Sequence, residues 1–436
     1  MTTTTESSTT RSTEQQSRNQ LATILLAVTF SRLVVNMTRR FPYPFIGAIA
    51  RQIGVPISNV QTVMAGQAAI GLSSPLFGPL SQRYGRKRVM LGALFVIALA
   101  SLLAMLLPQF WIFALVIVAF GFGKFIYDPA MHAYVSDRTS YQQRGFALGI
   151  TELSWAFSLI IIAPIAGFLL ATSSRPPEQE VVLTLIGYDP MPGLLVSSSG
   201  LQSVFALLFG LSLISLLAIW VLIPADKPTQ ATTSGLTSPL AAWQMMRGNP
   251  AALGALAYMA ALSAANEIFF INYGIWMETR FDLVLAALGI ATTIIALAEV
   301  GGEAAIITLS DRLGKKHMAM VGSFVAGISY VSLPLLATSL DGALVGLFIM
   351  FLGFEIGIVG SIPLFSEILP HARAIMLSGV AAAAAFGRLV GAVLGGSLFQ
   401  FSGDFVMIGL VATVIGCAAT FAMWRYVHIN EEAETV

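Results

Sequence analysis

Polar side chains run along one face of the first long apolar segment at spacings of three and four residues. They are Arg32, Asn36, Arg40 and Tyr43, and a helix places residues with this spacing on one side. An arginine near the centre of a bilayer costs at least ~2.5 kcal/mol to insert, so it needs an anion beside it. That anion is either a protein group, such as Asp128 or a helix carbonyl, or the acidic part of a bound molecule. The sequence leaves both interpretations open.

A lysine and an aspartate, Lys124 and Asp128, lie one helical turn apart in a later apolar segment. Side chains at this spacing can neutralise each other, which favours a structural ion pair. If Asp128 turns toward Arg40 instead, the two form an ion pair that can be made and broken. His132, one turn further on, is predicted to make a helix-end hydrogen bond rather than to relay protons.

Two glutamates, Glu299 and Glu303, share one face of a segment in the second half of the chain. Two carboxylates this close cannot both ionise cheaply in a low dielectric, so we expect one of them to hold a proton. They are therefore candidates for proton coupling. The alternative is structural, with hydrogen bonds to the basic turn around Asp311 or to Arg388.

Three more polar residues interrupt apolar segments of the second half, namely Asn266, its neighbour Glu267, and Glu355. Each acid is a candidate for binding a proton or a cation, or for a hydrogen-bonded structural role. Arg388 lies in the glycine-rich stretch 387–396, whose small residues suit close helix packing. We expect Arg388 to form a salt bridge between helices.

The charges inside apolar segments are distributed unevenly. The first half holds four cations and two acids, and the second half holds four acids and one cation. This predicts an anionic part of a substrate near the first segment and proton-accepting carboxylates in the second half. Ion pairs between the halves would explain the same distribution.

The segments that carry these residues belong to a membrane protein. The chain has 436 residues, of which 56% are hydrophobic and 10% charged, with a mean hydropathy of +0.81, so it has too little charge to cover a water-facing surface. About 20 apolar residues cross the hydrocarbon core. Twelve such runs predict an all-α fold with twelve transmembrane helices, near residues 21–50, 58–80, 88–107, 110–135, 146–172, 202–223, 251–276, 284–309, 318–340, 342–366, 375–400 and 405–427.

Composition also limits the partners and the chemistry. A net charge of +1, with cations spread over short loops, argues against nucleic acid. Cys417 is the single cysteine, which excludes a disulfide within the chain and a multi-cysteine metal site, and we predict no cofactor. The sequence contains no nucleotide-binding Gly-x-x-x-x-Gly-Lys-Ser/Thr loop and no hydrolase signature, so we expect neither an ATP-driven pump nor an enzyme.

Changes in composition divide the chain into two helical bundles with polar ends and a linker. The predicted parts are a disordered cytoplasmic tail over 1–19, six-helix bundles over 20–224 and 251–428, a cytoplasmic linker over 225–250 and a second tail over 429–436. Within the linker, residues 240–246 include Trp243 and two methionines and predict one short interfacial turn.

A basic turn occurs once in each bundle. Residues 78–88 read Gly-Pro-Leu-Ser-Gln-Arg-Tyr-Gly-Arg-Lys-Arg, and the order Leu-Ser-x-Arg-x-Gly followed by two cations returns 229 residues later at 309–316. A pair of glycines 26 residues apart also recurs, as Gly123 and Gly149 and then as Gly353 and Gly379. Six crossings return each copy to its starting side, so we expect parallel repeats related by an axis along the membrane normal.

The positions of the cations predict the orientation. If both termini are inside, 15 of the 23 Lys and Arg residues lie on that side, three lie outside at Arg51, Arg175 and Arg280, and five lie within helices. Cytoplasmic loops keep the excess of positive residues. We therefore predict cytoplasmic termini in a cell membrane, either an inner or a plasma membrane.

Twelve helices with this turn after the second and the eighth resemble the major facilitator superfamily of secondary transporters, over residues 20–428. The resemblance implies that helices one, four, seven and ten line a cavity, that two, five, eight and eleven join the halves, and that three, six, nine and twelve are outer scaffold. The predicted scaffold runs 89–107, 204–223, 318–340 and 405–424 contain no Asp, Glu, Lys, Arg or His, as contact with lipid requires. Family geometry also brings Glu152 of helix five toward Glu299 and Glu303, and with Asp128 it joins the proton-coupling candidates.

The resemblance further implies that the two basic turns latch the cytoplasmic ends of the halves. The latch residues are Gly78, Gln82, Arg83, Gly85 and Arg86 in the first turn, and Asp311, Arg312, Gly314 and Lys315 in the second. The family usually has an acid at the position of Gln82. The second turn keeps that acid as Asp311, so we expect latches of unequal strength.

These observations predict a proton-coupled secondary transporter that moves a small organic solute by alternating access, as an efflux permease similar to the sugar and drug exporters of that family. One alternative is proton-linked uptake of an organic anion, which the arginine stripe favours. An alternative of another class is a membrane sensor that binds a solute without moving it. We expect a monomer whose partners are the solute, protons and the lipid bilayer. The predicted substrate cavity contains Arg32, Asn36, Arg40, Tyr43, Lys124, Asp128, Asn266, Glu267 and Glu355.

Overall fold

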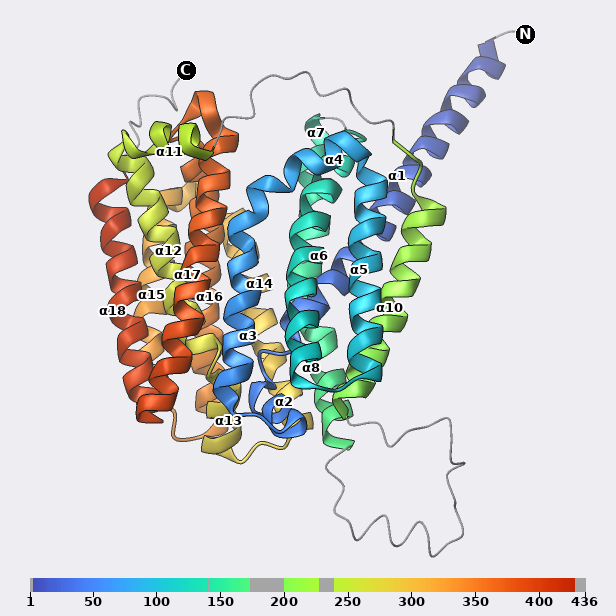
Figure 1. Cartoon of the computed structure of the whole chain (residues 1–436). Helices are drawn as coiled ribbons and strands as arrows, with labels where there is room; N and C mark the ends of the chain where they lie inside the picture. The colour runs from blue at the N-terminus through green and yellow to red at the C-terminus, as the bar shows by residue number, and fades with distance from the viewer. Residues whose placement is uncertain (1–2, 140, 173–199, 227–238, 428–436) are drawn as a thin grey trace, which may run out of the picture.

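The computed structural model describes residues 3–139, 141–172, 200–226 and 239–427, and within these ranges every regular element is a helix (Figure 1). The first half comprises α1 (Thr3–Arg40), α2 (Ile46–Ile53), α3 (Ile57–Ile70), the 3₁₀ helix η1 (Gly71–Leu76), α4 (Gly78–Tyr84), α5 (Arg86–Leu106), α6 (Phe110–Ser136), α7 (Tyr141–Glu152), α8 (Ser154–Thr172) and α10 (Gly200–Leu222). The second half comprises α11 (Pro239–Arg247), α12 (Pro250–Phe270), α13 (Tyr273–Phe281), α14 (Leu285–Leu313), α15 (Lys315–Leu336), α16 (Leu340–Ser366), η2 (Pro370–Ala372), α17 (Arg373–Ser402) and α18 (Phe405–Tyr426).

Eleven helical segments in the described residues are long and apolar enough to cross a membrane. The predicted second crossing, 58–80, differs from them because it is made of α3, η1 and α4 in succession. Pro75 and Pro79 lie in this stretch, and a proline lacks the N–H that continues an α-helix. The three pieces follow one another along α6, and α3 and η1 also pack against α17, so together they form the twelfth membrane-spanning unit (Figure 1).

The first helix differs from its predicted bounds at both ends. It begins at Thr3, so residues predicted to be a disordered tail are helical, and Thr3–Arg40 contains no Pro or Gly that would end a helix. It stops at Arg40, before Pro42 and Pro44, and the chain resumes as α2. The first helix of the second half breaks at the corresponding place, between α12 and α13. Both halves therefore interrupt their first helix at the same end of the bundle.

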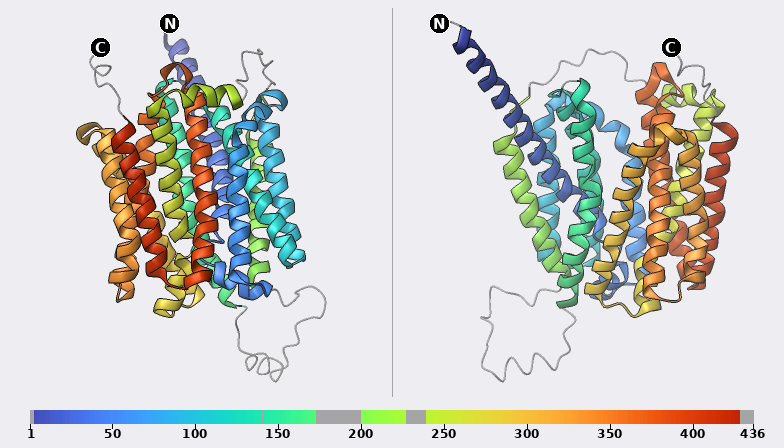
Figure 2. Two further views of the ribbon diagram at one scale, coloured as in Figure 1. Left: turned by 60° about the vertical axis from the view of Figure 1, so that its left-hand side comes forward. Right: turned by 180° about the vertical axis from the view of Figure 1, so that it is seen from behind.

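The helices form two bundles that lie side by side (Figure 2). The bundles meet through α3 and η1 against α17, through α8 against α14, and through α2 against α13. These include the second, fifth, eighth and eleventh crossings, as the family resemblance implies. In contrast, α5 and α10 pack with each other in the first bundle, and α15 and α18 do so in the second.

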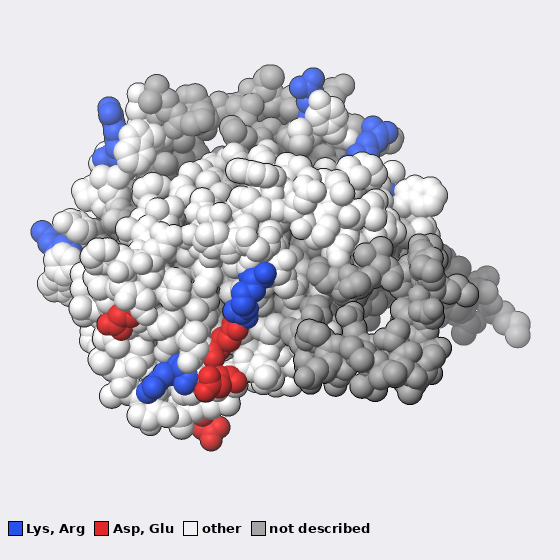
Figure 3. Space-filling model, turned by 60° about the horizontal axis from the view of Figure 1, so that its bottom comes forward, with Lys and Arg blue, Asp and Glu red and all other residues white. Residues whose placement is uncertain are grey.

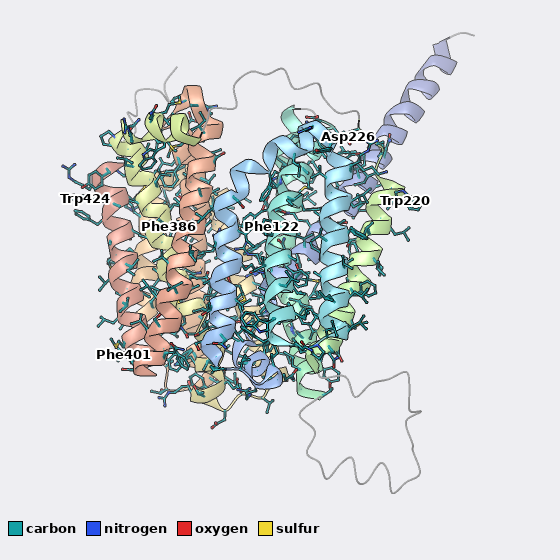
Figure 4. The ribbon with its side chains drawn as sticks, in the orientation of Figure 1. Phe122, Trp220, Asp226, Phe386, Phe401 and Trp424 are labelled. Carbon is teal, nitrogen blue, oxygen red and sulfur yellow. The ribbon has the colours of Figure 1, made fainter. Side chains whose placement is uncertain are left out.

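The outer surface of both bundles is apolar. Large side chains on it include Trp220, Phe386, Phe401 and Trp424, which are 64%, 52%, 85% and 56% exposed and point away from the ribbon in Figure 4. The end of the bundles opposite the two chain termini also shows few charged side chains, and some acidic and basic ones lie close together there (Figure 3). An apolar girdle of this kind is what lipid tails require of a protein surface.

The basic turn has the same backbone in both halves. Gly85 has φ +88° and Gly314 has φ +82°, values that residues with a Cβ rarely adopt. In the first turn, the Asp226 carboxylate, labelled in Figure 4, accepts hydrogen bonds from the backbone N–H groups of Arg86 at 2.6 Å and Lys87 at 3.0 Å. A carboxylate at a helix N-terminus also stabilises the helix dipole.

The described contacts of the first turn stay within its own half. Arg86 forms an ion pair with Asp137 and donates to the carbonyl of Ala133 at 2.8 Å, both near the end of α6. Arg83 lies over the ring of Tyr84. Neither contact bridges the halves, and the side chains of Gln82 and Asp311 lie outside the described part of the structure. The inter-half latch stays a prediction.

At the face away from the chain ends, the two halves approach each other through glycines. A Cβ built at Gly274 would lie 2.1 Å from the Pro44 carbonyl oxygen, and one at Gly289 would lie 2.3 Å from that of Ala163. Neither position has room for a side chain. Close backbone packing therefore joins the halves at this face, which we call the closed face.

Gly289→Val is expected to push α14 away from α8 and to favour a conformation in which the closed face opens. The measurement is labelling of a cysteine placed at Asn266, in a Cys417→Ser background, with an impermeant maleimide added from the closed-face side. Labelling is expected to rise. Gly210→Val is the matched control, because a Cβ at Gly210 meets no atom within 4 Å. Equal labelling in both variants would contradict the expected opening.

Candidate functional site

A cavity of about 810 Å³ lies between the two bundles. Its lining comes from α1 and the turn after it, α6, α7 and α8 on one side, and from α12, α14, α16 and α17 on the other. It is lined by Arg39, Arg40, Tyr43, Lys124, Phe125, Phe146, Gly149, Ile150, Glu152, Leu153, Trp155, Ser263, Asn266, Glu267, Phe270, Glu299, Glu303, Ile306, Ile307, Phe351, Phe354, Glu355, Ile358, Val359, Ile362 and Arg388. The described lining contains no residue of α5, α10, α15 or α18, the helices predicted to be scaffold.

The cavity opens toward the face where Thr3 and Val427 lie. Phe146 on α7 and Ile307 near the end of α14 line it and are 74% and 80% exposed, so they mark its mouth. At the other end, the rings of Tyr43 and Phe270 stack with centroids 4.3 Å apart. The two faces therefore differ, with an open mouth at one and packed rings and glycines at the other.

A buried ion pair joins the halves across the cavity. The Arg40 guanidinium donates from Nη1 to Glu299 Oε2 at 2.8 Å and from Nη2 to Oε1 at 2.7 Å. Both side chains are at most 5% exposed. Arg40 also donates to the Trp155 carbonyl at 2.8 Å and lies over the Trp155 ring, whose Nε1–H donates to Glu299 at 3.2 Å. Two-point pairing of this kind is geometrically specific and stronger than a single neutral hydrogen bond.

This pairing changes two sequence predictions. Arg40 was expected to meet either Asp128, a carbonyl or a bound anion, and it meets Glu299 and a carbonyl. One of Glu299 and Glu303 was expected either to hold a proton or to bond to the turn at Asp311 or to Arg388, but both oxygens of Glu299 accept from Arg40. The sequence could not predict this pair, because the two residues lie 259 positions apart.

A second polar network lies within the first half, behind the cavity wall. Asp128 accepts from Lys124 Nζ at 2.7 Å and from Arg32 Nε at 3.3 Å. Lys124 also donates to Asn36 Oδ1 at 2.6 Å, and Asn36 donates to Ser154 Oγ at 3.2 Å. The predicted Lys124–Asp128 ion pair is confirmed, and Asp128 turns toward Arg32 rather than Arg40.

Arg32 links this network to the end of α7. Its Nη2 lies 2.9 Å from Glu152 Oε2, and its Nη1 donates to the Thr151 carbonyl at 2.8 Å. The last carbonyls of a helix have no partner within the helix, so Arg32 satisfies one of them. His132 lies 3.0 Å from the other oxygen of Glu152, which is the hydrogen bond predicted for it.

Three residues predicted to line the substrate cavity are therefore part of its support. The residues that do not line the cavity are Arg32, Asn36 and Asp128. Their polar atoms form hydrogen bonds inside the first bundle, between Arg32 and Asp128 and between Asn36 and Lys124. The other six predicted residues, Arg40, Tyr43, Lys124, Asn266, Glu267 and Glu355, do line it.

Four carboxylates from both halves interact electrostatically at one side of the cavity. Glu355 on α16 interacts with Glu299 and Glu303 on α14 and with Glu152 on α7. Glu299 and Glu152 each have an arginine partner, Arg40 and Arg32. Glu303 and Glu355 form no ion pair with any described residue within the 4.0 Å limit.

A glycine brings Glu355 against α14. A Cβ at Gly302 would lie 2.7 Å from the Glu355 Cβ, so α16 packs directly on the backbone beside Glu303. Glu355 is 5% exposed. An ionised carboxylate without a partner is expensive at such a site, and neutralisation by a proton removes most of that cost. The pair Glu303 and Glu355 can therefore hold a proton.

The floor of the cavity joins α1 to α12. Tyr43 donates to Glu267 Oε1 at 2.8 Å, and both side chains are buried. Beneath it, Gln61 donates to Asn272 Oδ1 at 2.8 Å, which links α3 to the break between α12 and α13. Hydrogen bonds thus cross between the halves in two layers on the way to the closed face.

Two cavity arginines have no carboxylate partner among the described residues. Arg39 on α1 is 4% exposed and lies over the Phe125 ring. Arg388 on α17 has a buried Nε without a hydrogen-bond partner, so the salt bridge predicted for it is absent from the described contacts. The predicted close packing around it is confirmed, because Cβ atoms at Gly387, Gly391 and Gly395 would lie 2.1, 2.5 and 2.7 Å from backbone oxygens of α12.

Sequence reasoning missed Arg39, Trp155 and Phe270 as residues of the site. Arg39 precedes Arg40 and falls off the three-and-four stripe, yet the helix ends one residue later and both side chains reach the cavity. Trp155 lies just after the helix break at Leu153. The apolar run 146–172 did not indicate this break. Among the described residues, no group of three or more His, Cys, Asp or Glu side chains is arranged to hold a metal ion.

Comparisons with known proteins agree with this architecture. The family model of the Major Facilitator Superfamily matches residues 28–366. The MFS-type transporter YceJ of Bacillus subtilis (strain 168) is 25% identical over 356 residues, which cover 80% of this chain and 83% of YceJ. A shorter match to the MFS-type transporter YwfA of the same organism is 28% identical over 100 residues and covers 23% of this chain and 24% of YwfA.

Solved structures share the fold at low sequence identity. A bacterial homologue of the human lysosomal transporter Spinster, in an inward-facing and unoccupied conformation, superposes with a TM-score of 0.73 at 12% identity, covering 94% of this chain and 98% of that one. A mutant of the nucleoside transporter NupG gives 0.72 at 15% identity, covering 93% and 100%.

Proposed function

Because this chain belongs to the Major Facilitator Superfamily and is an integral membrane transporter of that family, we propose that it couples the movement of a small organic solute to protons by alternating access. The observation that carries the proposal is the cavity between the halves, open at one face, in which Glu303 and Glu355 lie without an ion-pair partner among the described residues. Intramembrane carboxylates of this kind are typical of proton pathways.

Alternating access requires two states of the contact between the halves. In the state described here, the Arg40–Glu299 pair, the Tyr43–Glu267 hydrogen bond and the glycine contacts hold the closed face together. We propose that both termini are cytoplasmic in a cell membrane, so that this is the inward-open state. The solute then enters or leaves the cavity past Phe146 and Ile307.

For the direction of transport, we propose efflux, with the open cavity loading solute from the cytoplasm. Uptake of an organic anion is the second candidate, and it is favoured by Arg39 and Arg388, which have no carboxylate partner among the described residues. Inverted and right-side-out membrane vesicles separate the two. Accumulation of solute in inverted vesicles, driven by an outwardly directed proton gradient from an acidic lumen, supports efflux in exchange for protons. Accumulation in right-side-out vesicles, driven by an inwardly directed proton gradient, supports uptake together with protons.

Replacing both unpaired acids is expected to remove the coupling to protons. Glu303→Gln and Glu355→Gln keep the shape of each side chain, and neither product can bind and release a proton. Solute flux through the double variant, measured in proteoliposomes over an acidic to neutral pH series, is expected to lose most of its pH dependence and to stop acidifying or alkalinising the lumen. Glu367→Gln, an exposed acid paired with Arg373 outside the cavity, is the control.

Unchanged pH dependence in the double variant would reject these acids as the proton site. Solute flux without any proton movement in the wild type would reject coupling itself. Binding without flux would instead support a sensor.

A further inference from the structure

We propose that Arg39 and Arg388 form a binding site for the acidic group of the transported solute, and that the solute is an amphipathic organic anion whose apolar body lies against cavity phenylalanines. The inference rests on the proposed transport function and names its substrate class. It depends on four observations: two cations of the cavity, the buried Arg39 and the half-buried Arg388, without ion-pair partners among the described residues, their origin in different halves, the engagement of the other cavity cations, and the apolar wall beside them.

The other cations of the cavity are already neutralised by protein groups. Arg40 is held by both oxygens of Glu299, and Lys124 by Asp128 and Asn36. Arg39 and Arg388 differ from them, since no described carboxylate lies within the 4.0 Å of an ion pair from either guanidinium. An intramembrane cation in this situation is a functional candidate by default.

Arg39 and Arg388 line the same cavity as Glu267. Arg39 repels Arg388 electrostatically, and both act on Glu267 and on the Tyr43 hydroxyl. Glu267 does not form an ion pair with them within 4.0 Å, and it accepts the Tyr43 hydrogen bond instead. Arg39 and Arg388 carry two positive charges, and Glu267, which already accepts a hydrogen bond from Tyr43, can balance at most one of them. A bound anion would neutralise the remaining positive charge.

The geometry of guanidinium groups favours an oxyanion. Each guanidinium presents N–H donors in a planar fork that fits a carboxylate or a phosphate at two points. Arg388 carries a buried Nε with no partner in the described structure. A buried donor of this kind costs free energy until it is satisfied, so ligand binding can supply the missing hydrogen bond.

Arg39 and Arg388 also come from opposite halves, on α1 and α17. An anion held between them would draw the two bundles together through the ligand. The same contact would be lost when the solute leaves, which links occupancy to the arrangement of the halves. A solute recognised by one half alone would not have this effect.

The cavity wall includes several aromatic side chains, which favour a solute with an apolar body. Phe125, Phe270, Phe351 and Phe354 line the cavity, and Arg39 lies over the first of them with its Cζ 5.3 Å from the ring centroid. The volume of about 810 Å³ greatly exceeds that of an inorganic anion. Sites of this kind combine a mainly apolar lining with a few polar groups that orient the ligand.

The test compares ligands that differ only in charge. The probes are 2-naphthoate, the neutral 2-naphthamide and the cationic 2-naphthylmethylammonium, added to the purified full-length chain in detergent. Binding is measured by calorimetry and by the rise in melting temperature that a ligand of the folded state produces. We expect naphthoate to bind at least tenfold more tightly than the amide or the amine.

Substitutions then assign the preference to the two arginines. Arg39→Gln and Arg388→Gln are each expected to weaken naphthoate binding at least tenfold and to leave naphthamide binding unchanged, whereas Arg39→Lys and Arg388→Lys retain part of the preference for the anion. Arg373→Gln, a surface arginine paired with Glu367, is the control and should change neither. The melting temperature without ligand shows whether each variant is folded. If a Gln variant does not fold, the Lys variant at the same position is used for the comparison instead.

Three results would overturn the proposal: equal affinity for naphthoate and naphthamide in the wild type, full naphthoate affinity in both Gln variants, or no binding of naphthoate at all. Different results would reject the proposed binding site and the proposed transport function. Naphthoate binding that needs both arginines, without flux in proteoliposomes, rejects transport and leaves the site. Flux of the neutral amide that is indifferent to both arginines rejects the site and leaves transport.

Discussion

Glu299→Gln is expected to abolish transport and to destabilise the fold, because it leaves the Arg40 guanidinium buried without a counter-charge. Removing one partner of a buried ion pair costs about 3–5 kcal/mol, and both side chains here are at most 5% exposed. Since the pair joins α1 to α14, part of that loss falls on the contact between the halves. A loss of 3 kcal/mol there changes the balance between the two transport states by a factor of about 100.

A double-mutant cycle measures this pair directly. Arg40→Gln combined with Glu299→Gln removes both charges, so the double variant is expected to be more stable than Glu299→Gln alone while transport stays impaired. Thermal unfolding in detergent and solute flux in proteoliposomes provide the two readouts. The exposed pair Arg373–Glu367, with side chains 57% and 49% exposed, is the matched control. Exposed pairs contribute about 0–1 kcal/mol, so its cycle should show little coupling. Additive effects of the two cavity substitutions would show that the pair has no such role.

The repeat made much of the fold predictable from sequence. The basic turn and the paired glycines placed the crossings and related the halves. The first glycine of each pair, Gly123 or Gly353, lies against the third helix of its half, whereas the second glycines differ, because a Cβ at Gly149 meets no atom within 4 Å and one at Gly379 would lie 2.6 Å from Met246. A Cβ at Gly123 would lie 2.5 Å from an atom of Ile97 on α5, and one at Gly353 would lie 2.8 Å from the Gly322 carbonyl on α15. Each glycine therefore lets the fourth helix of its half pack closely on the third.

Helix interruptions were harder to predict than helices. Apolar content defines a crossing, but it does not distinguish one continuous helix from α3, η1 and α4 in succession. Prolines did mark two of the breaks, at Pro42 and at Pro75. The break at Leu153 carries no such signal, although it places Trp155 beside Arg40.

Spacing along one helix identifies which side chains share a face, and this explains both the success and the failure of the site prediction. The Lys124–Asp128 pair is local and was predicted from a four-residue spacing. The Arg40–Glu299 and Tyr43–Glu267 contacts join residues more than 200 positions apart, and only the packing of the bundles brings them together. Spacing also placed Arg32 and Asn36 on the cavity stripe, whereas their partners on α6, α7 and α8 hold them behind the wall.

This separation between cavity and support predicts two classes of variant. Substitutions at Arg39, Arg388, Glu303 or Glu355 should alter ligand preference or proton coupling, because these side chains line the cavity and have no ion-pair partner among the described residues. Substitutions in the network behind the wall should alter stability. The most demanding case of the second class is Asp128, which pairs with both Lys124 and Arg32.

Asp128→Asn is expected to lower the stability of the protein by about 2–4 kcal/mol, because a buried charge that loses its counter-charge is costly. Lys124 keeps only uncharged partners among the described residues, the Asn36 oxygen at 2.6 Å and the Trp155 ring, whereas Arg32 keeps Glu152 at 2.9 Å and the Thr151 carbonyl. The loss therefore falls mainly on Lys124. It follows that Lys124→Met should be milder than Asp128→Asn, since Asp128 still pairs with Arg32, and that the two substitutions together should restore most of the melting temperature.

The same three variants decide between a structural and a switching role for Asp128. If the network is support, the solute affinity of Asp128→Asn, measured on the folded fraction, stays within about twofold of the wild type, since Asp128 does not line the cavity. An ion pair that is made and broken during transport gives a different result. Asp128→Asn would then keep its melting temperature and lose flux, and cysteine labelling from the closed-face side would rise, as expected for Gly289→Val. Because Asp128 accepts from two buried cations of its own bundle at 2.7 and 3.3 Å, we expect the structural result: lower stability, unchanged affinity, and recovery when Lys124 is removed as well.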